Sequence, residues 1–492
     1  MSYAAEEQVA KRKLIPVEAQ FIRTARSLSP ITDKVTTQSF FVMYGRFLLP
    51  FYERNPDMKM LNIGLGCEDV SARLWRKLLP KANLWEAETK VTCVGSEIEG
   101  LNSLTGDQGD VQVLDSWVEK SGGMFDIIVD DGNSHHNCQV MTTFEKLWPQ
   151  LTPGGLYFFE DLHLGKRDDH RSHSTPSCDG SSFVFSDNIK NWLDDIIYQG
   201  GYSSKKWDLH FVFCQAGGCV VAKEPPGTIY NKPPNSNQFD KKQMLPAEHH
   251  FVTTAEKFDP VTDKVSTHSF YTMYGRFLLP YYQRKPGMKM LEIGLGCDMN
   301  YGPGASVSLW KKLFPGSELW EAEYDGACVE KALKEGTLDG LHPLVGDQGN
   351  NATLDSWIQR SGGQFDIVID DGGHHNCQIK ASFDKLWPQL VPGGLYFIED
   401  ISGECKLNVL LIAFDQSNLV HSRCTTVGKW RGYRKYSTPT CPNSFTFSDL
   451  LKEWLDDIIY QGDHGSRKWD ASFIFCQAEA CVIGKEDSLG VD

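Results

Sequence analysis

Short apolar runs alternate with amphipathic segments of helical spacing through the C-terminal half of the chain. MKMLEIGL (288–295) ends in glycines, as a buried parallel strand does where the chain turns into a helix. After it come the helical SVSLWKKLF, the strand-like ELWEAE, a helical segment around ACVEKALKEG, the strand-like FDIVID, the helical IKASFDKLWPQL, a VPGG turn and the strand-like GLYFIED. Alternating strands and helices predict a doubly wound, mostly parallel α/β sheet.

The last patterned segment departs from this alternation. SFIFCQAEACVIGKE (472–486) holds two β-rich runs around a short turn, which predicts an antiparallel hairpin rather than a crossover. A mostly parallel sheet that ends in an antiparallel hairpin resembles the Rossmann-like fold of class I methyltransferases. The resemblance raises the expectation of that fold, whereas function has to be argued from the site.

The whole pattern occurs twice. ITDKVTTQSFFVMYGRFLLP (31–50) returns as VTDKVSTHSFYTMYGRFLLP (261–280), and LWEAE, GDQG, HHNCQ, KLWPQL and WLDDIIYQG recur in the same order. A period of about 230–260 residues is far longer than a solenoid repeat, so each unit is a whole domain. We therefore predict tandem methyltransferase-like domains at 1–224 and 248–492, joined by a Pro- and Asn-rich linker at 225–247. They are expected to form an intramolecular pseudo-dimer, and further homo-oligomerisation stays open.

Composition narrows the choice of partners. The 492 residues carry 64 acidic and 49 basic side chains, a net charge of −15, which argues against binding to a nucleic-acid backbone. No apolar stretch is long enough to span a bilayer, and the N-terminal MSYAAEEQVAKRK lacks the pattern of a secretory signal. The 14 cysteines include no CxxC pair and several lie in apolar runs, which favours buried reduced thiols in a cytoplasmic protein. We expect a small-molecule acceptor as partner, with no nucleic acid and no membrane.

Residues at the predicted strand ends form a candidate cofactor site, because ligands of such sheets bind beyond the carboxyl ends of the strands. The first strand of the second copy ends with Glu292, Gly294 and Gly296, an E-x-G-x-G pattern whose glycines let the backbone approach a ligand. A dinucleotide site would require a third glycine where Met299 stands, which disfavours NAD(P). The pattern resembles motif I of methyltransferases, which implies that Glu292 helps to hold the methionine part of S-adenosylmethionine.

The next two strand ends supply further polar groups. Glu323 ends the second strand, where an acidic side chain can accept hydrogen bonds from ribose hydroxyls. Asp347 and Gln348 follow the third strand, and their carboxylate and amide suit the edge of adenine. Any one of these acids could equally be a solvated loop residue, but three strand ends in the right order favour a cofactor site.

Carboxylates gather after the fourth and fifth strands. Asp371 follows FDIVID, while Glu399 and Asp400 end GLYFIED. If these strands are neighbours, the three side chains converge, and clustered carboxylates repel one another unless they are protonated or bind a cation. An all-oxygen set suits Mg²⁺, or less specifically Ca²⁺ or Mn²⁺. The alternative is that one acid caps a helix and another faces water.

Several motifs of the second copy together resemble the macrolide-sugar O-methyltransferase family of the mycinamicin and macrocin type: the TDK segment at 262–264, IGLGCDMNYGPGAS, GDQ, IDDG-x-H and GGLYFIED. The resemblance covers most of the second copy and, less completely, the first. It implies a Mg²⁺ ion held by Asp371, Glu399 and Asp400. It also implies that His374 is the base that takes the acceptor's proton, with His375 as the rival, since either ring could cap the next helix.

The first copy keeps some of these groups and changes others. The acids that remain are Asp131, Glu160 and Asp161. Asn62 stands at the position of Glu292, and Gln38 at that of His268. The stretch DMNYGPGASVSLW shrinks to EDVSARLW, and DDGGHH becomes DDGNSHH. Four changes around one pocket predict a weakened or lost site, so the second copy is expected to carry the function.

The second copy has an anomaly of its own, an extra segment around 401–427 that the first copy lacks. It directly follows two predicted metal ligands, so it is either a lid over the site or intron sequence translated through an error in the gene model.

These observations predict S-adenosylmethionine-dependent methyl transfer to a hydroxyl or amine of a small, secondary-metabolite type of acceptor, assisted by Mg²⁺. N-methylation of a small peptide or amine is the main variant. A non-catalytic tandem scaffold is the alternative that the losses in the first copy favour. NAD(P)-dependent oxidoreduction is disfavoured by Met299.

Overall fold

A computed structural model provides the fold. It describes residues 14–64, 69–89, 98–132, 136–166, 184–198, 207–225, 244–401, 446–460 and 469–487. We refer to the described residues up to 225 as the first half and to those from 244 as the second half. Most of the predicted linker, and the extra segment after Ile401, lie outside the described residues.

The second half begins with helices and continues as alternating strands and helices. Its helices are α11 (Pro246–Ala255), α12 (Asp263–Ser266), α13 (Tyr271–Met273), the π-helix η5 (Tyr274–Leu278), α14 (Leu279–Arg284), α15 (Ala305–Leu313), α16 (Gly326–Lys334), α17 (Asn351–Ser361), α18 (Asn376–Leu386), η6 (Trp387–Gln389) and α19 (Phe447–Ile459). Its strands are β8 (Lys289–Ile293), β9 (Glu318–Glu323), β10 (His342–Val345), β11 (Phe365–Asp370), β12 (Leu390–Ile398), β13 (Ala471–Gln477) and β14 (Ala480–Lys485).

The described part of the first half follows the same order. Its helices are α2 (Pro16–Arg26), α3 (Asp33–Thr36), α4 (Phe41–Met43), the π-helix η1 (Tyr44–Leu48), α5 (Leu49–Arg54), α6 (Val70–Leu78), α7 (Val111–Ser121), α8 (Asn137–Leu147), η3 (Trp148–Gln150), η4 (Leu162–Lys166) and α10 (Phe185–Ile197). Its strands are β1 (Lys59–Ile63), β2 (Asn83–Glu88), β3 (Leu101–Thr105), β4 (Phe125–Asp130), β5 (Leu151–Phe159), β6 (Leu209–Gln215) and β7 (Gly218–Lys223).

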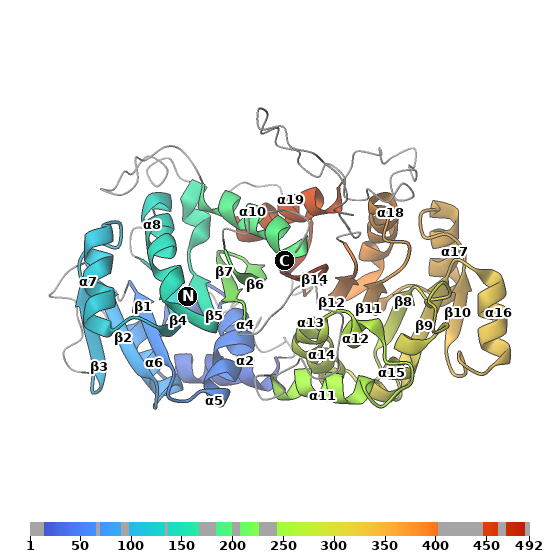
Figure 1. Cartoon of the computed structure of the whole chain (residues 1–492), viewed down its shortest axis with the longest axis horizontal. Helices are drawn as coiled ribbons and strands as arrows, with labels where there is room; N and C mark the ends of the chain where they lie inside the picture. Colours follow the sequence, from blue (N-terminus) through green and yellow to red (C-terminus); the bar gives the residue numbers. More distant parts are fainter. Residues whose placement is uncertain are drawn as a thin grey trace, which may run out of the picture.

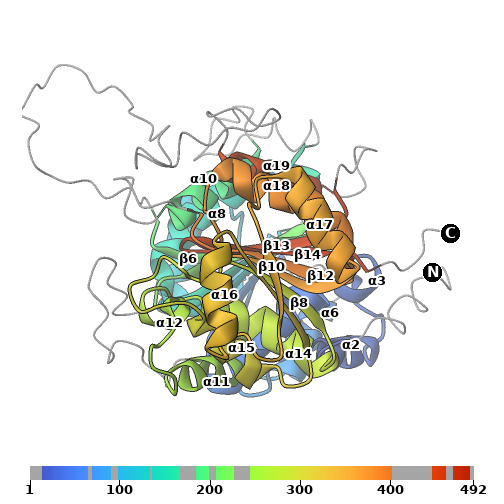
Figure 2. The ribbon, with the colours of Figure 1, turned by 90° about the vertical axis from the view of Figure 1, so that its right-hand side faces the viewer.

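All of these strands belong to one sheet. Its order is β10-β9-β8-β11-β12-β14-β13-β6-β7-β5-β4-β1-β2-β3, with the second half at one end and the first half at the other (Figure 1). In each half five strands run parallel, and the final hairpin pairs antiparallel with the fifth strand. Helices cover both faces of the sheet (Figure 2). The predicted mostly parallel α/β fold with a closing hairpin is confirmed, except that the predicted VPGG turn lies within strand β12.

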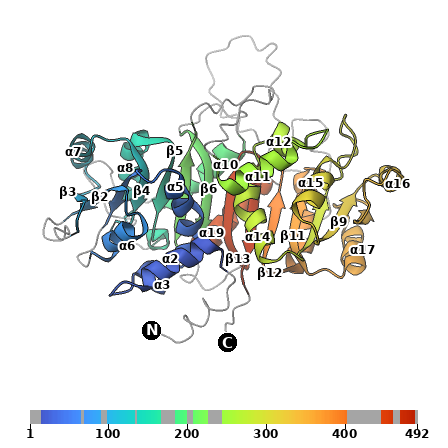
Figure 3. The same cartoon turned by 90° about the horizontal axis from the view of Figure 1, so that it is seen from below.

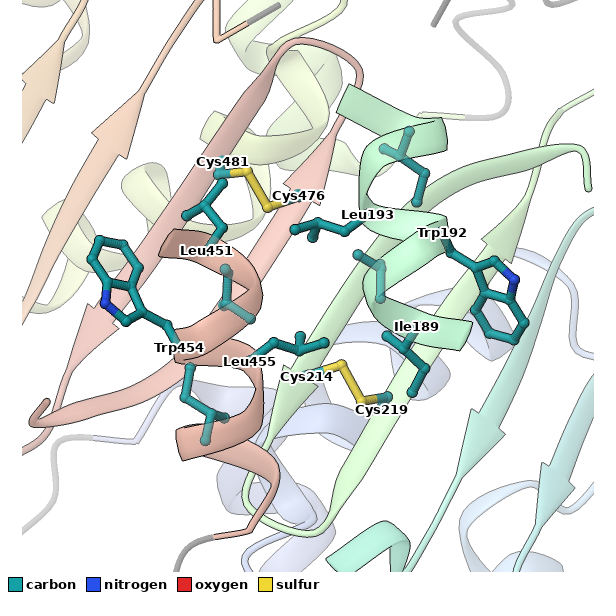
Figure 4. Packing of buried hydrophobic residues seen from close by; sticks show 14 of the residues in the cluster. Ile189, Trp192, Leu193, Cys214, Cys219, Leu451, Trp454, Leu455, Cys476 and Cys481 are labelled. Atoms are coloured by element: carbon teal, nitrogen blue, oxygen red, sulfur yellow. A yellow bond between two sulfur atoms is a disulfide. The ribbon is translucent and has the colours of Figure 1, made fainter. Parts of the chain in front are cut away.

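The two halves meet where β13 pairs antiparallel with β6. The pairing is reciprocal: Phe213 lies opposite Phe475, its own counterpart in the repeat, and the flanking residues exchange partners in the same symmetrical way. On one face of the sheet, α10 and α19 pack against each other over the junction, with Leu193 and Leu455 between them (Figure 4). Lys190 Nζ of α10 reaches Asp456 of α19 at 2.6 Å. Strand pairing and helix packing therefore give the halves a shared core.

The opposite face has a second core that also draws on both halves. Figure 3 views this face, with α2 and α11 close to the junction. The Arg46 guanidinium lies 5.3 Å from the Phe277 ring, and the Arg276 guanidinium lies 5.2 Å from the Phe47 ring. Both arginines come from the repeated YGRFL π-helices, so the symmetry of the junction extends through the sheet.

The expectation of reduced thiols is wrong for all eight cysteines that the structure describes, because each is disulfide-bonded, and six of them pair with one another. Three disulfides are described: Cys214–Cys219, Cys476–Cys481 and Cys297–Cys328. The first two cross the hairpins that meet at the junction (Figure 4), because the strand register places each pair of cysteines directly opposite one another. Among the described helices, none is long and apolar enough to cross a membrane. The cytoplasmic location stays a prediction.

Candidate functional site

A cavity of about 860 Å³ opens at the carboxyl ends of the parallel strands of the second half. Loops after β8, β9, β10, β11 and β12 form its walls, together with residues around α12. This is where a parallel α/β sheet is expected to bind a ligand. Of the residues predicted from the sequence, those that line the cavity are Gly294, Gly296, Glu323, Asp347, Gln348, Asp371, His374 and Asp400. Glu292 and Glu399 lie behind the wall, almost fully buried.

Gly294 brings two of these loops into contact. Its φ is +112°, and a Cβ atom on it would lie 2.0 Å from the Asp371 carbonyl oxygen. Any side chain would therefore push the loop after β11 away from the end of β8. The backbone N–H of Asp371 donates to the Ile293 carbonyl at 3.0 Å, which fixes Asp371 at the cavity floor.

Glu323 and Gln348 shape the cofactor side of the cavity. Glu323 accepts hydrogen bonds from the backbone N–H groups of Leu295 at 3.1 Å and Asp325 at 3.0 Å, and it keeps lone pairs for a ligand hydroxyl. Gln348 donates to Asp370 at 2.8 Å and accepts from the N–H of Gly373 at 2.8 Å. Both ends of this amide already have partners, so Gln348 supports the end of β11 from its place in the cavity wall.

Glu292 belongs to a buried carboxyl pair rather than to the cavity wall. Ser306 donates to it at 2.8 Å, and Lys264 Nζ lies 3.4 Å away. Burial, together with the adjacent Glu292, raises the pKa of Glu321 well above its usual value. In the first half Asn62 replaces Glu292 and donates to Glu86 at 2.8 Å. Asn62 thus replaces a carboxyl group by an amide, at the position that in the second half lies beneath the cavity, and gives the neighbouring Glu86 a hydrogen-bond donor.

Lys264 is the main residue that sequence reasoning missed. Its fully buried Nζ donates to Asp371 at 2.7 Å and to Glu399 at 2.7 Å. Tyr274 donates to the other oxygen of Glu399. Burial alone would lower the pKa of Lys264, but Asp371 and Glu399 outweigh it and hold that pKa well above its usual value. The first half repeats the arrangement around Lys34. The signal was the TDK motif, which occurs in both copies.

The predicted cluster of three carboxylates is therefore divided between two sites: Glu399 binds Lys264, and Asp400 lies with His374 at the cavity, while Asp371 belongs to both. β11 and β12 are parallel neighbours, as the prediction required. The cation between Asp371 and Glu399, however, is the ammonium of Lys264. Among the described residues, Asp371, His374 and Asp400 each place one ligand atom within 4.8 Å of the others, and Glu399 is not in that group. Two carboxylates with room for water suit Mg²⁺, so the cavity fits such an ion beside Lys264.

Asp400 lies between two histidines. Its Oδ2 is 3.8 Å from His374 Nε2, and its Oδ1 is 3.5 Å from His268 Nε2. Burial raises the pKa of Asp400, although His268 and His374 work against the rise. His374 and Asp400 have φ values of +53° and +52°, which non-glycine residues rarely adopt. His375 instead occupies the N-cap position of α18.

The first half retains the polar centre around Lys34, but the loops at its strand ends, 65–68, 90–97 and 133–135, lie outside the described residues. The predicted loss of its site, which depends on those loops and on the shifted histidines, therefore stays a prediction.

Curated proteins with known activities share part of this sequence. Mycinamicin VI 2''-O-methyltransferase of Micromonospora griseorubida is 37% identical over 136 residues, 27% of this chain and 32% of the relative. Demethylmacrocin O-methyltransferase of Streptomyces fradiae is 35% identical over 138 residues, 28% of this chain and 32% of the relative. L-olivosyl-oleandolide 3-O-methyltransferase of Streptomyces antibioticus is 26% identical, over 36% of this chain and 38% of the relative.

The chain is thus similar in sequence to sugar O-methyltransferases of polyketide biosynthesis, and the alignments span about a third of the length of these relatives. No family model matches the chain. A solved structure of the MycE methyltransferase of the mycinamycin pathway, in complex with Mg, SAH and mycinamycin VI, has 25% identity. The match covers 49% of this chain and 56% of that chain, with a TM-score of 0.35.

Lys264→Met is expected to destabilise the protein by about 3–5 kcal/mol at neutral pH, because it leaves buried carboxylates without their cation. Burial raises the pKa of Glu399 in the folded state, so this carboxyl resists ionisation there, whereas it ionises readily in the unfolded chain. Stability of the variant should therefore fall further as pH rises from about 5 to 8. Urea denaturation across that range measures it. Lys331→Met, which removes an exposed lysine paired with an exposed glutamate, is the control. A loss no larger than the control's would contradict the assigned role of Lys264.

Proposed function

We propose that the second half is an S-adenosylmethionine-dependent O-methyltransferase that acts on a hydroxyl group of a small molecule with the help of Mg²⁺. The observation that carries the proposal is the cavity. It brings a glycine-rich strand end and Glu323 together with Asp371, His374 and Asp400 in one space. The sequence similarity to sugar O-methyltransferases supports the same reaction and favours a sugar hydroxyl on a polyketide-like product as the acceptor.

The glycine-rich side is the proposed cofactor side. Gly294 and Gly296 leave the backbone open to the methionine part, and Glu323 can accept hydrogen bonds from the ribose hydroxyls. Asp347 lines the same wall and already accepts from the N–H of Gly349 at 2.8 Å, which fixes its carboxylate beside the proposed adenine position. Glu292 acts from below this wall through its contacts with Ser306 and Lys264.

The opposite side is the proposed acceptor side. Asp371 and Asp400 would hold Mg²⁺, which would orient the acceptor and acidify its hydroxyl. His374 lies close enough to this point to take the released proton. Transfer of the methyl group then depends mainly on alignment of the acceptor oxygen with the sulfonium methyl. Glu399 contributes indirectly, because it holds Lys264 against Asp371.

Two alternatives lose support. A purely structural scaffold does not account for the wide cavity lined by strand-end acids and histidines. N-methylation would use the same cofactor side, but the relatives are named as O-methyltransferases.

Glu323→Ala is expected to weaken binding of S-adenosylhomocysteine by about 1–3 kcal/mol, the usual loss for a charge-assisted hydrogen bond. Isothermal titration of the full chain measures it. Glu88→Ala, at the matching position of the first half, is the control and should change total binding little. Equal losses in the two variants would show that the halves bind cofactor equally.

Methyl transfer is expected to require a divalent cation. EDTA should abolish transfer from labelled S-adenosylmethionine to a sugar-bearing polyketide such as mycinamicin VI, and Mg²⁺ should restore it. Asp371→Asn should remove activity together with the response to Mg²⁺, because the amide loses the charge that attracts the ion. Unchanged turnover by demonstrably metal-free protein would rule out metal assistance.

His374→Ala should lower kcat by about 10²–10⁴-fold, the usual contribution of a positioned general base. S-adenosylhomocysteine affinity should stay nearly unchanged, because the imidazole lies on the acceptor side. His375→Ala is the matched control and should reduce kcat less. The reverse ranking would assign the base to His375, and near-normal kcat in both variants would leave positioning alone to explain catalysis.

A further inference from the structure

His268 is a cavity residue with a carboxylate at each ring nitrogen. Its Nδ1 lies 2.7 Å from Glu479 Oε2, and its Nε2 lies 3.5 Å from Asp400 Oδ1. The ring stacks on Phe270, with 4.7 Å between ring centroids and 11° between planes. These three contacts hold the imidazole beside Asp400, at the edge of the acceptor side of the cavity.

Glu479 comes from the turn of the β13–β14 hairpin, close to the junction between the halves. Its backbone N–H donates to the carbonyl of Ile197, the last residue of α10 in the first half, at 3.3 Å. Its carbonyl accepts from the N–H of Ile401, next to Asp400, at 3.0 Å. One residue therefore contacts the first half through its N–H, the loop after β12 through its carbonyl and His268 through its side chain.

The first half has the same backbone contacts without the side-chain pair. Gly217 stands at the position of Glu479, and its N–H donates to the Ile459 carbonyl at 3.0 Å. Gln38 stands at the position of His268 and donates to Asp161 at 3.0 Å. The pair of His268 and Glu479 is therefore found in the second half, where the described residues enclose the cavity. Its presence there links the pair to the chemistry of that cavity.

We propose that His268 and Glu479 are positioning residues that fix the Asp400 carboxylate for a divalent cation, with the first half holding Glu479 in place through the end of α10. This inference rests on the proposed function in one respect: it takes the divalent cation at Asp371 and Asp400 to be part of the reaction. The first half thereby acts as a supporting part of the active site of the second half.

The test is the affinity of the full chain for Mn²⁺ alone, followed by electron paramagnetic resonance. Glu479→Gly installs the residue of the first half and should weaken Mn²⁺ binding by about 10–100-fold, the usual effect of removing a residue that orients a metal ligand. Glu479→Gln keeps an oxygen that can accept from the ring and should recover most of the affinity. Gln38→Ala is the matched control in the first half and should leave the strongest Mn²⁺ site unchanged. Thermal unfolding of each variant reports any general loss of structure.

Each outcome is decisive. An equal loss in Glu479→Gln and Glu479→Gly would overturn the positioning role. It would make Glu479 a metal ligand itself, together with His268 and Asp400, whose ligand atoms lie within 4.8 Å of one another and of Glu479. Unchanged Mn²⁺ affinity in Glu479→Gly, or a wild-type chain that does not bind Mn²⁺, would also overturn it. Titration with S-adenosylhomocysteine tests the proposed function separately from the positioning role. If the variants bind Mn²⁺ as expected but the chain does not bind S-adenosylhomocysteine, the positioning role stands and the proposed methyl transfer is wrong.

Discussion

The buried ammonium of Lys264 is the interaction on which the site of the second half depends. Parallel strands β8, β11 and β12 end side by side, and each brings a carboxyl group close to the others: Glu292 and Glu399 are almost fully buried, and Asp371 lies at the cavity wall. Three carboxylates this close would repel one another, and the two buried ones would also lose their hydration. Lys264 lies 2.7–3.4 Å from all three, which lets the strand ends stay together. Asp371 can then present its carboxylate to the cavity while its position is fixed from behind.

The second constraint is the junction. Because β13 pairs with β6, neither hairpin has an exposed edge, and the two halves share cores on both faces of the sheet. The reciprocal register gives each half the same backbone contact with the other, through Gly217 in one direction and Glu479 in the other. Symmetry of the backbone therefore coexists with a difference in side chains, because His268 and Glu479 stand where the first half has Gln38 and Gly217.

Sequence reasoning predicted the strands well because their apolar runs and glycine-rich ends are local signals. It placed Asp371, His374 and Asp400 correctly at neighbouring strand ends, since strand order determines where those ends lie. It could not recognise Lys264 as the counterion of Asp371 and Glu399, because that residue is far away in sequence and its short helix has no pattern that points to the sheet. The disulfides of the two hairpins were missed for a related reason: their pairing depends on hairpin register, which composition does not reveal.

The most direct test of this account is a crystal structure of the full chain with Mn²⁺ and S-adenosylhomocysteine, in which anomalous scattering locates the ion. The account predicts a single strong peak in the second half, bonded to Asp371 and Asp400 at about 2.0–2.3 Å, while Lys264 stays on Glu399. It also predicts S-adenosylhomocysteine along the wall formed by Gly294, Gly296 and Glu323. An ion bonded to Glu399 with Lys264 displaced, or cofactor bound only in the first half, would contradict it.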